Sequence, residues 1–287
     1  MASWIALLLA TRNAKPETPI RMNRIEERFA SLRRAGRKGL IVYLGAGDPD
    51  LARTRELALA LDQAGVDCLE LGVPFSDPLA DGVVNQLAAQ RGLASGTTPR
   101  GVLDAVTSIR RESQIPVVLY TYFNLLHRYG LEPFIADAAH AGVDGILTLD
   151  LPPEEAGGYE TLMRAADLCN IYLVAPTTPD DRVATITQRA RGFVYYVSRE
   201  GVTGMQQAVA EDLAVKIGRI RAHTKLPVAV GFGISNAEQA RAVAALADAV
   251  VVGSAVVDRI AKHGRSPDLA PRIAAFVAGL AKAVKTA

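Results

Sequence analysis

The sequence predicts an α/β protein built as one closed barrel of eight βα units. From Gly39 onward, short β-rich apolar runs alternate with longer amphipathic stretches, the pattern of a parallel sheet with connecting helices. The chain has 287 residues, which lies within the range of about 200 to 400 residues of single α/β barrels. No linker or second block of composition divides it. A doubly wound open sheet is the weaker alternative.

Eight apolar runs are expected to form the strands. Strands of a parallel sheet are buried on both faces and read as continuous apolar runs, as Ile-Val-Tyr-Leu and Ala-Val-Val-Val do here. In chain order the runs are Leu40–Leu44, Cys68–Val73, Val117–Tyr122, Gly145–Leu149, Ile171–Ala175, Phe193–Val197, Pro227–Val230 and Ala249–Val252. An extra N-terminal helix is expected ahead of them, in one barrel domain that spans residues 22–287.

The helices between these runs carry their own start and stop signals. Asp50 is expected to cap a helix whose leucines share one face, and Gly65 is expected to end it. The phrase Ala-Gly-Val-Asp occurs at residues 64–67 and again at residues 141–144, each time between a helix and a strand. This repetition fits a repeated βα unit, but it is too short to establish a duplication.

Composition and charge exclude several classes of protein. The chain is 49% hydrophobic with a net charge of +2, which is typical of a globular protein, and no basic run interleaved with aromatic residues suggests nucleic-acid binding. The apolar stretch Trp4–Ala10 is too short to span a membrane. Residues 1–21 are interpreted as a disordered tail or as a start codon assigned upstream of Met22. Cys68 and Cys169 are expected to be unpaired thiols in a reducing compartment, the cytoplasm.

Glu70 is the first candidate for chemistry. Catalytic residues of such barrels lie where strands end, and alternation along the second run places Glu70 and Cys68 opposite Leu69 and Leu71. If the leucines pack against the helices, the carboxylate points into the barrel mouth. Burial there would raise its pKa toward values useful for proton transfer. An ion pair with a neighbouring Arg or Lys is an equally weighted alternative.

The loop from Gly72 to Gly82 is long for a βα connection, and long ordered loops often act as lids. It contains two more carboxylates, Asp77 before Pro78 and Asp81 before Gly82. Turn formation is the simpler interpretation of both at this point. Acid/base work together with Glu70 is the other.

Glycine-rich turns after the last two runs predict an anion site. Gly231-Phe232-Gly233-Ile234-Ser235 follows the seventh run and Gly253-Ser254 follows the eighth, each ahead of a helix. Barrels commonly build a phosphate site there from backbone N–H groups and a helix N-terminus. A third loop, residues 198–204, is a candidate cover for the ligand. Ordinary strand-to-helix turns are the alternative.

Metal and covalent schemes find no support in the sequence. The four histidines lack the spacing of metal ligands, so no metal is expected; they are His127, His140, His223 and His263. No nucleophile elbow or P-loop occurs, and none of the eight runs contains a lysine for Schiff-base chemistry. The interpretation that is left is carboxylate acid/base catalysis on a phosphorylated substrate.

The segment from Leu69 to Gly82 closely resembles the signature segment of the tryptophan synthase alpha chain family. Further similar motifs occur in the family's order; they are Gly47-Asp48-Pro49, Asp150-Leu151-Pro152, residues 198–204 and residues 231–235. The resemblance extends from about Met22 to the last helix. It implies a TIM barrel lyase of tryptophan biosynthesis that cleaves indole-3-glycerol phosphate to indole and glyceraldehyde 3-phosphate, a retro-aldol reaction without a cofactor.

The resemblance also implies roles for individual residues. Glu70 would be the acid/base for protonation at the indole C3 atom, Asp81 would hold the indole N–H and stabilise positive charge on the ring, and Tyr195 would lie beside the glutamate. The phosphate would be bound by backbone around Gly204, Gly233, Gly253 and Ser254. The indole pocket would comprise Tyr43, Tyr122, Leu147, Leu173 and Phe232, although core packing alone would explain Tyr122 and Phe232.

A partner follows from the same resemblance. The chain would form an alpha2beta2 heterotetramer with a tryptophan synthase beta chain, which would hold pyridoxal phosphate and receive the indole. A stand-alone lyase that releases free indole, and a weakly active barrel that serves mainly as an allosteric partner, are the alternatives. Departures from the family pattern bear on partner contacts and pocket shape. Asp81-Gly82 is followed by Val83-Val84-Asn85, where the family usually has Asp-Gly-Pro, and Leu125 follows Asn124, where Asn-Pro is common. Tyr120 stands where a smaller or more flexible apolar residue is usual, and Leu149 where a small one can occur.

Overall fold

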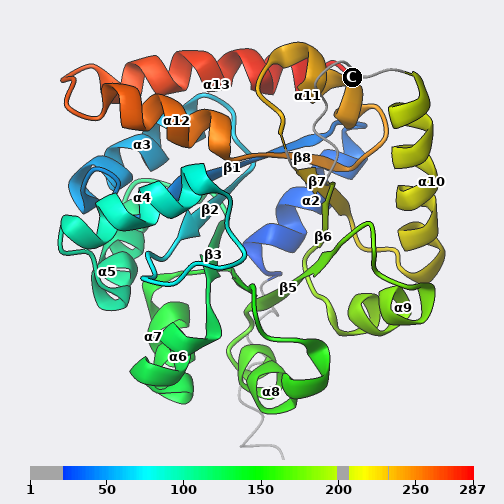
Figure 1. The fold of residues 1–287 in the computed structure, drawn as a ribbon, viewed down its shortest axis with the longest axis horizontal. Helices are drawn as coiled ribbons and strands as arrows, with labels where there is room; N and C mark the ends of the chain where they lie inside the picture. Colours follow the sequence, from blue (N-terminus) through cyan, green and yellow to red (C-terminus); the bar gives the residue numbers. More distant parts are fainter. Residues whose placement is uncertain (1–21, 199–206, 232) are drawn as a thin grey trace, which may run out of the picture.

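Eight parallel strands close into a barrel in sequence order, with β8 paired to β1 (Figure 1). The structure is a computed structural model, and it describes residues 22–198, 207–231 and 233–287. The predicted closed barrel is confirmed, and the open doubly wound sheet is wrong. The predicted tail, residues 1–21, lies outside the described residues.

The strands lie within two residues of the predicted runs. Their bounds are β1 (Gly39–Gly45), β2 (Cys68–Gly72), β3 (Val117–Thr121), β4 (Gly145–Thr148), β5 (Cys169–Val174), β6 (Val194–Val197), β7 (Val228–Gly231) and β8 (Ala249–Val252). Five of them, β1, β2, β4, β7 and β8, are buried along their whole length. This burial explains why the sequence shows continuous apolar runs rather than alternation.

Helices surround the barrel and cover its outer face (Figure 1). They are α2 (Arg24–Arg34), α3 (Leu51–Gln63), α4 (Val83–Ala94), α5 (Pro99–Arg110), α6 (Phe123–Tyr129), α7 (Leu131–Ala141), η1 (Pro153–Glu155), α8 (Gly157–Ala165), α9 (Asp180–Arg189), α10 (Gln207–His223), α11 (Ala237–Ala244), α12 (Ser254–His263) and α13 (Leu269–Lys285). The predicted cap of α3 is confirmed, because the Asp50 side chain accepts a hydrogen bond from the Arg53 N–H. Within the described residues, no helix has the length and apolar character needed to cross a membrane.

Helix α2 is the predicted extra helix, and it closes the amino-terminal end of the barrel (Figure 1). Its apolar face, Ile25, Phe29 and Leu32, belongs to the same buried cluster as the side chains inside the barrel. The Asn23 amide ahead of it donates to the main-chain oxygen of Asp144, at the start of β4. Since one end is covered, the carboxyl ends of the strands form the mouth of the barrel.

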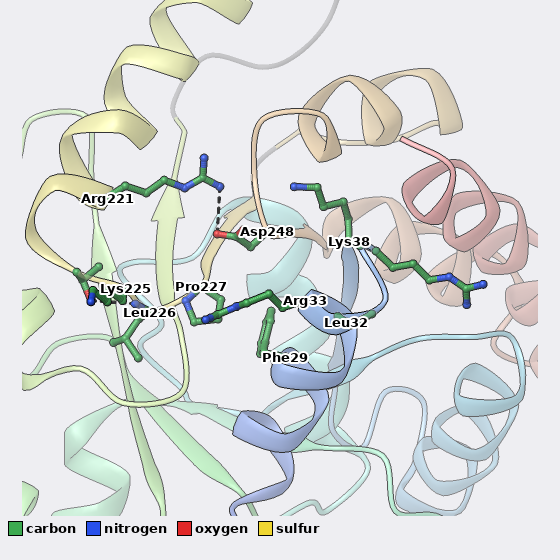
Figure 2. Close-up of a pocket in the computed structure, with 12 residues that line it drawn as sticks. Phe29, Leu32, Arg33, Lys38, Arg221, Lys225, Leu226, Pro227 and Asp248 are labelled. Carbon is green, nitrogen blue, oxygen red and sulfur yellow. Dashed lines mark hydrogen bonds and ion pairs between the residues drawn. The ribbon is translucent and has the colours of Figure 1, made fainter.

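A hollow of about 410 Å³ lies beside α2 at the amino ends of β1 and β7 (Figure 2). Basic side chains, among them Arg33, Lys38 and Lys225, surround it, and Arg221 forms an ion pair with Asp248 at 3.1 Å. In barrels of this class the amino-terminal face contributes to stability, and the chemistry takes place at the opposite face. We therefore place the candidate active site elsewhere.

Aspartates ahead of three strands tie each of them to the preceding strand. The carboxylate of each accepts an N–H from the start of that neighbour, in the pairs Asp67 with Leu40 at 2.9 Å, Asp144 with Val117 at 2.8 Å and Asp248 with Val228 at 2.9 Å. The first two aspartates end the repeated Ala-Gly-Val-Asp phrase. In each copy of the phrase, a glycine with a left-handed backbone, Gly65 or Gly142, ends the helix. The aspartate that follows then accepts a hydrogen bond from the neighbouring strand, and we call this contact an aspartate lock.

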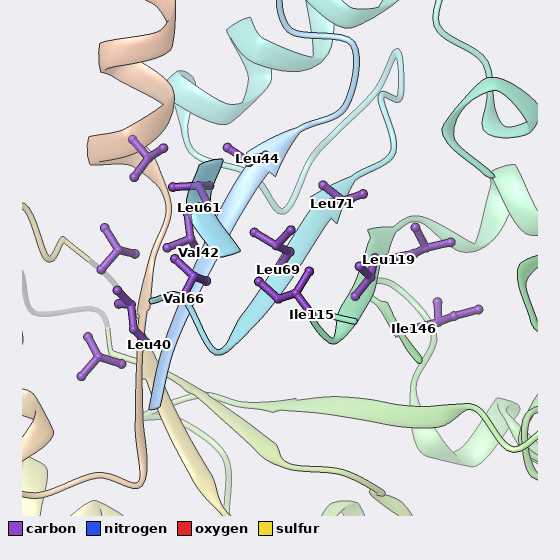
Figure 3. Close-up of a cluster of buried hydrophobic side chains, with 14 of the residues drawn as sticks. Leu40, Val42, Leu44, Leu61, Val66, Leu69, Leu71, Ile115, Leu119 and Ile146 are labelled. Carbon is purple, nitrogen blue, oxygen red and sulfur yellow. The ribbon is translucent and has the colours of Figure 1, made fainter. Parts of the chain in front are cut away.

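Side chains of the strands alternate between an outer layer and the barrel interior. Leu69 and Leu71 lie in the layer between strands and helices (Figure 3), whereas Cys68 lies inside the barrel. The predicted alternation along β2 is confirmed, and it turns Glu70 inward. Cys68 and Cys169 are both buried and unpaired, as predicted.

Candidate active site

Glu70 lies near the carboxyl end of β2 and is 1% exposed. Its Oε1 atom has no hydrogen-bond partner, and no ion pair joins it to any Arg or Lys in the described part of the chain. The ion-pair alternative is therefore not seen here. Burial raises the pKa of Glu70 to about 8. A carboxyl group with this pKa carries its proton at pH 7 and can act as a general acid.

Tyrosine side chains surround the inward-facing glutamate. Tyr43 is the direct neighbour of Glu70 in the strand register, and its ring meets the ring of Tyr120 edge-on at 5.1 Å. Burial raises the pKa of Tyr195 well above its ordinary value, and the nearby charges of Glu70 and Asp81 add to this rise. The structure thus brings Tyr195, Glu70 and Asp81 into one electrostatic neighbourhood.

Two glycines at strand ends make room for these tyrosines. A Cβ atom at Gly72 would lie 2.1 Å from the hydroxyl oxygen of Tyr43, and one at Gly231 would lie 2.6 Å from that of Tyr195. Any side chain at either glycine would displace a tyrosine from the barrel mouth. The role of both was missed in the sequence, although glycine at the end of a buried strand is a signal of close approach.

Asp81 lies on the loop between β2 and α4, and its carboxylate is held by hydroxyl groups from the neighbouring strand β3 and from the residue after it. Tyr122 donates to Oδ2 at 2.8 Å and Tyr120 donates to Oδ1 at 3.0 Å. Burial raises the pKa of Asp81, while hydrogen bonds from Tyr122, Tyr120 and Asn85 lower it. Asp81 is therefore more than a turn former, whereas Asp77 is exposed and matches the simpler interpretation.

The loop that carries Asp81 is docked on Tyr122. The Ala80 N–H donates to the Tyr122 hydroxyl at 3.0 Å, and the Phe75 ring packs on the Tyr122 ring at 5.1 Å. In addition, the Gln86 side chain donates to the main-chain oxygen of Asp81 at 2.9 Å. These contacts fix the loop against the end of β3 and leave the Asp81 carboxylate at the mouth.

Gly253 and Ser254, two of the residues predicted to bind an anion, lie at the start of α12. Helix α12 begins at Ser254, immediately after β8 and Gly253, and no side chain caps it. The first N–H groups of a helix have no partner within the helix, so they are available to an anion. A Cβ atom at Gly253 would lie 3.5 Å from Cβ of Tyr43, which places this helix start beside the mouth.

The other predicted binding residues are found in different situations. Gly233 is exposed and has a left-handed backbone with φ of +68°. Leu147 has no exposed surface and packs inside the barrel, while Leu173 is partly exposed against the same cluster. Gly204 and Phe232 lie outside the described residues.

A buried ion pair ties the loop after β1 to α4. Asp48 is 2% exposed, and its two carboxylate oxygens accept hydrogen bonds from Arg91 at 2.8 and 2.7 Å. Because α4 follows the loop that carries Asp81, this pair fixes the position of that loop's far end. Sequence reasoning recognised Gly47-Asp48-Pro49 but not its partner, which lies 43 residues away.

No group of three or more His, Cys, Asp or Glu side chains that could hold a metal ion occurs in residues 22–198, 207–231 and 233–287. The chemistry available to the described mouth is that of its carboxyl groups, tyrosine hydroxyls and main-chain N–H groups. Glu70 can donate a proton, Asp81 can accept an N–H or face a positive charge, and the start of α12 can bind an anion.

Comparison with known proteins shows similarity over almost the whole chain. The family model described as tryptophan synthase alpha chain matches residues 29–285. The tryptophan synthase alpha chain of Opitutus terrae is 52% identical over 258 residues, which cover 90% of this chain and 97% of the relative. That of Alkalilimnicola ehrlichii is 52% identical over 259 residues, which cover 90% and 94%.

Solved structures agree with the sequence comparison. The alpha subunit of tryptophan synthase from Legionella pneumophila superimposes with a TM-score of 0.85 at 37% identity, covering 92% of this chain and 99% of that chain. A structure of tryptophan synthase from M. tuberculosis superimposes with a TM-score of 0.81 at 36% identity, covering 91% and 98%.

Proposed function

Because the chain belongs to the tryptophan synthase alpha chain family and is the indole-3-glycerol-phosphate lyase of tryptophan biosynthesis, we propose that Glu70 and Asp81 are its catalytic residues. The observation that carries this proposal is the contrast between the two carboxyl groups. Glu70 is buried with an unpartnered oxygen and a pKa raised to about 8, whereas the pKa of Asp81, which burial also raises, is lowered in part by the tyrosine hydroxyls that hydrogen-bond to its carboxylate. These different surroundings suit Glu70 to act as a proton donor and Asp81 to act as an ionised carboxylate.

In the proposed mechanism Glu70 donates its proton to C3 of the indole ring. The ring then carries a positive charge at nitrogen, and the ionised Asp81 accepts the N–H and stabilises that charge. Glu70, now ionised, takes the proton of the glycerol hydroxyl as the carbon–carbon bond breaks and its electrons return to the ring. Indole and glyceraldehyde 3-phosphate leave, and Glu70 is again protonated. Tyr195 lies beside Glu70 during these transfers.

The substrate would be held at both of its ends. We assign its phosphate to backbone around Gly204, Gly233, Gly253 and Ser254, and its indole ring to Tyr43, Tyr122, Leu147, Leu173 and Phe232. The uncapped start of α12 beside Tyr43 supports the first assignment. The reaction needs no cofactor on this chain.

A partner surface is proposed on the loop that carries Asp81 and on α4. Four large apolar side chains project from it into solvent: Leu79 is 92% exposed, Val83 is 69% exposed, Leu87 is 46% exposed and Leu93 is 40% exposed. Such side chains are typical of a protein interface. We propose that the tryptophan synthase beta chain, which would hold pyridoxal phosphate, covers them in an alpha2beta2 complex, and that contact at Leu79 influences Asp81 two residues away.

We place the enzyme in the cytoplasm as a single catalytic domain spanning residues 22–287. The unpaired thiols of Cys68 and Cys169 support a reducing compartment.

Release of indole from indole-3-glycerol phosphate, measured with and without a beta chain, tests this proposal and its alternatives. We expect cleavage by the isolated chain and strong acceleration by the beta chain. Equal rates in both conditions would favour the stand-alone lyase, and the absence of single-turnover cleavage by the isolated chain would favour a barrel that acts mainly as an allosteric partner.

A further inference from the structure

Both oxygens of the Asp81 carboxylate accept hydrogen bonds from tyrosine hydroxyls of the chain. Oδ2 accepts from Tyr122 and Oδ1 accepts from Tyr120, and Asn85 adds a third side-chain hydrogen bond. The Oδ1 atom of Asn85 has no partner among the described residues, so its amide NH₂ is the group that serves Asp81. A carboxylate on a loop is thus fixed by donors from β3, from the residue after it and from α4.

The Tyr120 hydroxyl is held in place independently of the loop. Tyr120 lies in β3, and its ring packs edge-on against Tyr43 of β1 at 5.1 Å, a favoured aromatic geometry. Tyr122 stands two residues further along, so both rings lie on the same face of the extended chain. Tyr120 in β3 and Tyr122 just after it therefore present two hydroxyls to the carboxylate on the loop.

We propose that Tyr120 and Asn85 are positioning residues for the lyase reaction, which hold the Asp81 carboxylate in the direction from which it meets the indole N–H. This inference rests on the proposed role of Asp81 and goes beyond it, because it assigns a function to residues at two of the places where the sequence departs from the family pattern. The polar groups of both residues contact Asp81. Both act through Asp81.

A substitution at Tyr120 tests the positioning of Asp81 without disturbing the anchoring of the loop, whereas a substitution at Tyr122 would affect both. The Tyr122 hydroxyl also accepts the Ala80 N–H, so its removal would disturb the backbone of the loop. The hydroxyl of Tyr120 contacts Asp81, while its ring contacts Tyr43. Replacement of Tyr120 by Phe removes the hydrogen bond and keeps the ring.

The test compares Tyr120→Phe, Asn85→Ala and the double variant in an indole-release assay with the full chain and indole-3-glycerol phosphate. We expect kcat to fall on the order of 10-fold for each single variant, with KM nearly unchanged, because the positive charge that Asp81 stabilises develops only in the transition state. Loss of a donor raises the pKa of Asp81, and Asp81 works only when ionised. The acidic limb of the kcat profile should therefore move to higher pH.

Tyr129→Phe is the matched control. The Tyr129 hydroxyl also donates to an aspartate, Asp137, at 2.6 Å, but this pair lies on α6 and α7 away from the mouth. We expect its kcat and pH profile to equal those of the unmodified protein. Thermal unfolding of each variant shows that the fold is kept, and Asn85→Ala tests the inference independently of ring packing in β3.

The inference is overturned if Tyr120→Phe and Asn85→Ala both match Tyr129→Phe in kcat and in the acidic limb. This failure can be told from failure of the proposed function. If Asp81→Asn keeps full activity, the role of Asp81 itself is wrong. If Asp81→Asn is inactive while both positioning variants behave as the control, only the present inference fails.

Discussion

Glu70 is a buried ionisable side chain, and one of its carboxyl oxygens has no hydrogen-bond partner within the described residues. Its place was predictable, because alternation along four residues of β2 determines which of them face inward. The environment of Asp81 was not predictable. Its donor Tyr120 lies 39 residues away, and only the pairing of β2 with β3 brings the two together.

Burial of Glu70 predicts a specific dependence of stability on pH. An unfolded glutamate has a pKa of about 4.5 and this one has a pKa of about 8, so between these values the folded state binds a proton that the unfolded state has lost. The free energy of unfolding should therefore fall as pH rises from about 4.5 to about 8 and then level off. Glu70→Gln has no titrating group at this position, so its free energy of unfolding should not fall in this way. Relative to the unmodified protein, the free energy of unfolding of the variant should increase by a few kcal/mol between pH 5 and pH 9.

Urea unfolding at pH 5, 7 and 9 measures this difference, with Glu27→Gln on the exposed face of α2 as the control. The control should follow the unmodified protein at every pH. If Glu70→Gln does the same, the buried glutamate is not protonated in the folded state.

At the scale of elements, apolar runs and helix signals predicted the positions of the βα units. This was possible because a strand that is buried on both faces appears in the sequence as a continuous run of apolar residues. The start of β5 was predicted two residues late. The strand begins at Cys169, which pairs with Gly145, and then contains Asn170, which is only 5% exposed. A buried polar residue interrupts an apolar run without ending the strand, and only the register reveals this.

The aspartate locks predict where the barrel is sensitive to mutation. Asp144 accepts the N–H of Val117 and forms ion pairs with Arg24 and Arg110, both at 2.7 Å, while only 3% of its side chain is exposed. Its replacement by Ala leaves a buried N–H and two guanidinium groups without their acceptor. We expect Asp144→Ala to lower the free energy of unfolding by about 3 kcal/mol.

Asp258→Ala provides the comparison, because Asp258 pairs with Lys262 on the surface of α12. An exposed pair of this kind contributes less than about 1 kcal/mol. Urea unfolding measures both variants, and we expect a clearly larger decrease in the free energy of unfolding for Asp144→Ala. Equal decreases would show that the buried interactions of Asp144 stabilise the fold no more than an exposed ion pair does.

At the scale of the whole molecule, one end of the barrel is closed by α2 and the other carries every described candidate for chemistry (Figure 1). The alternation of elements predicted this architecture. It did not predict which side chains face solvent around the mouth, since exposure of Leu79 and Val83 depends on how the loop docks onto Tyr122. The roles of Gly204 and Phe232 stay predictions.

The exposed apolar surface predicts the effect of a charge on partner binding. Val83→Lys should weaken association with the beta chain at least 10-fold, because a buried interface would have to desolvate the ammonium group. Val215→Lys on α10 is the matched control, since Val215 is 63% exposed and Val83 is 69% exposed. Titration of each variant with the beta chain measures both. An equal effect of the two substitutions would place the partner surface elsewhere.

Single-turnover cleavage of indole-3-glycerol phosphate by Glu70→Gln tests the central claim most directly. The variant keeps the size of the side chain and removes the proton donor. Unfolding of the variant is measured alongside, and we expect the barrel to be intact. We predict a rate on the order of 1000-fold or more below that of the unmodified chain. A folded Glu70→Gln variant that cleaves the substrate at a near-normal rate would contradict the account.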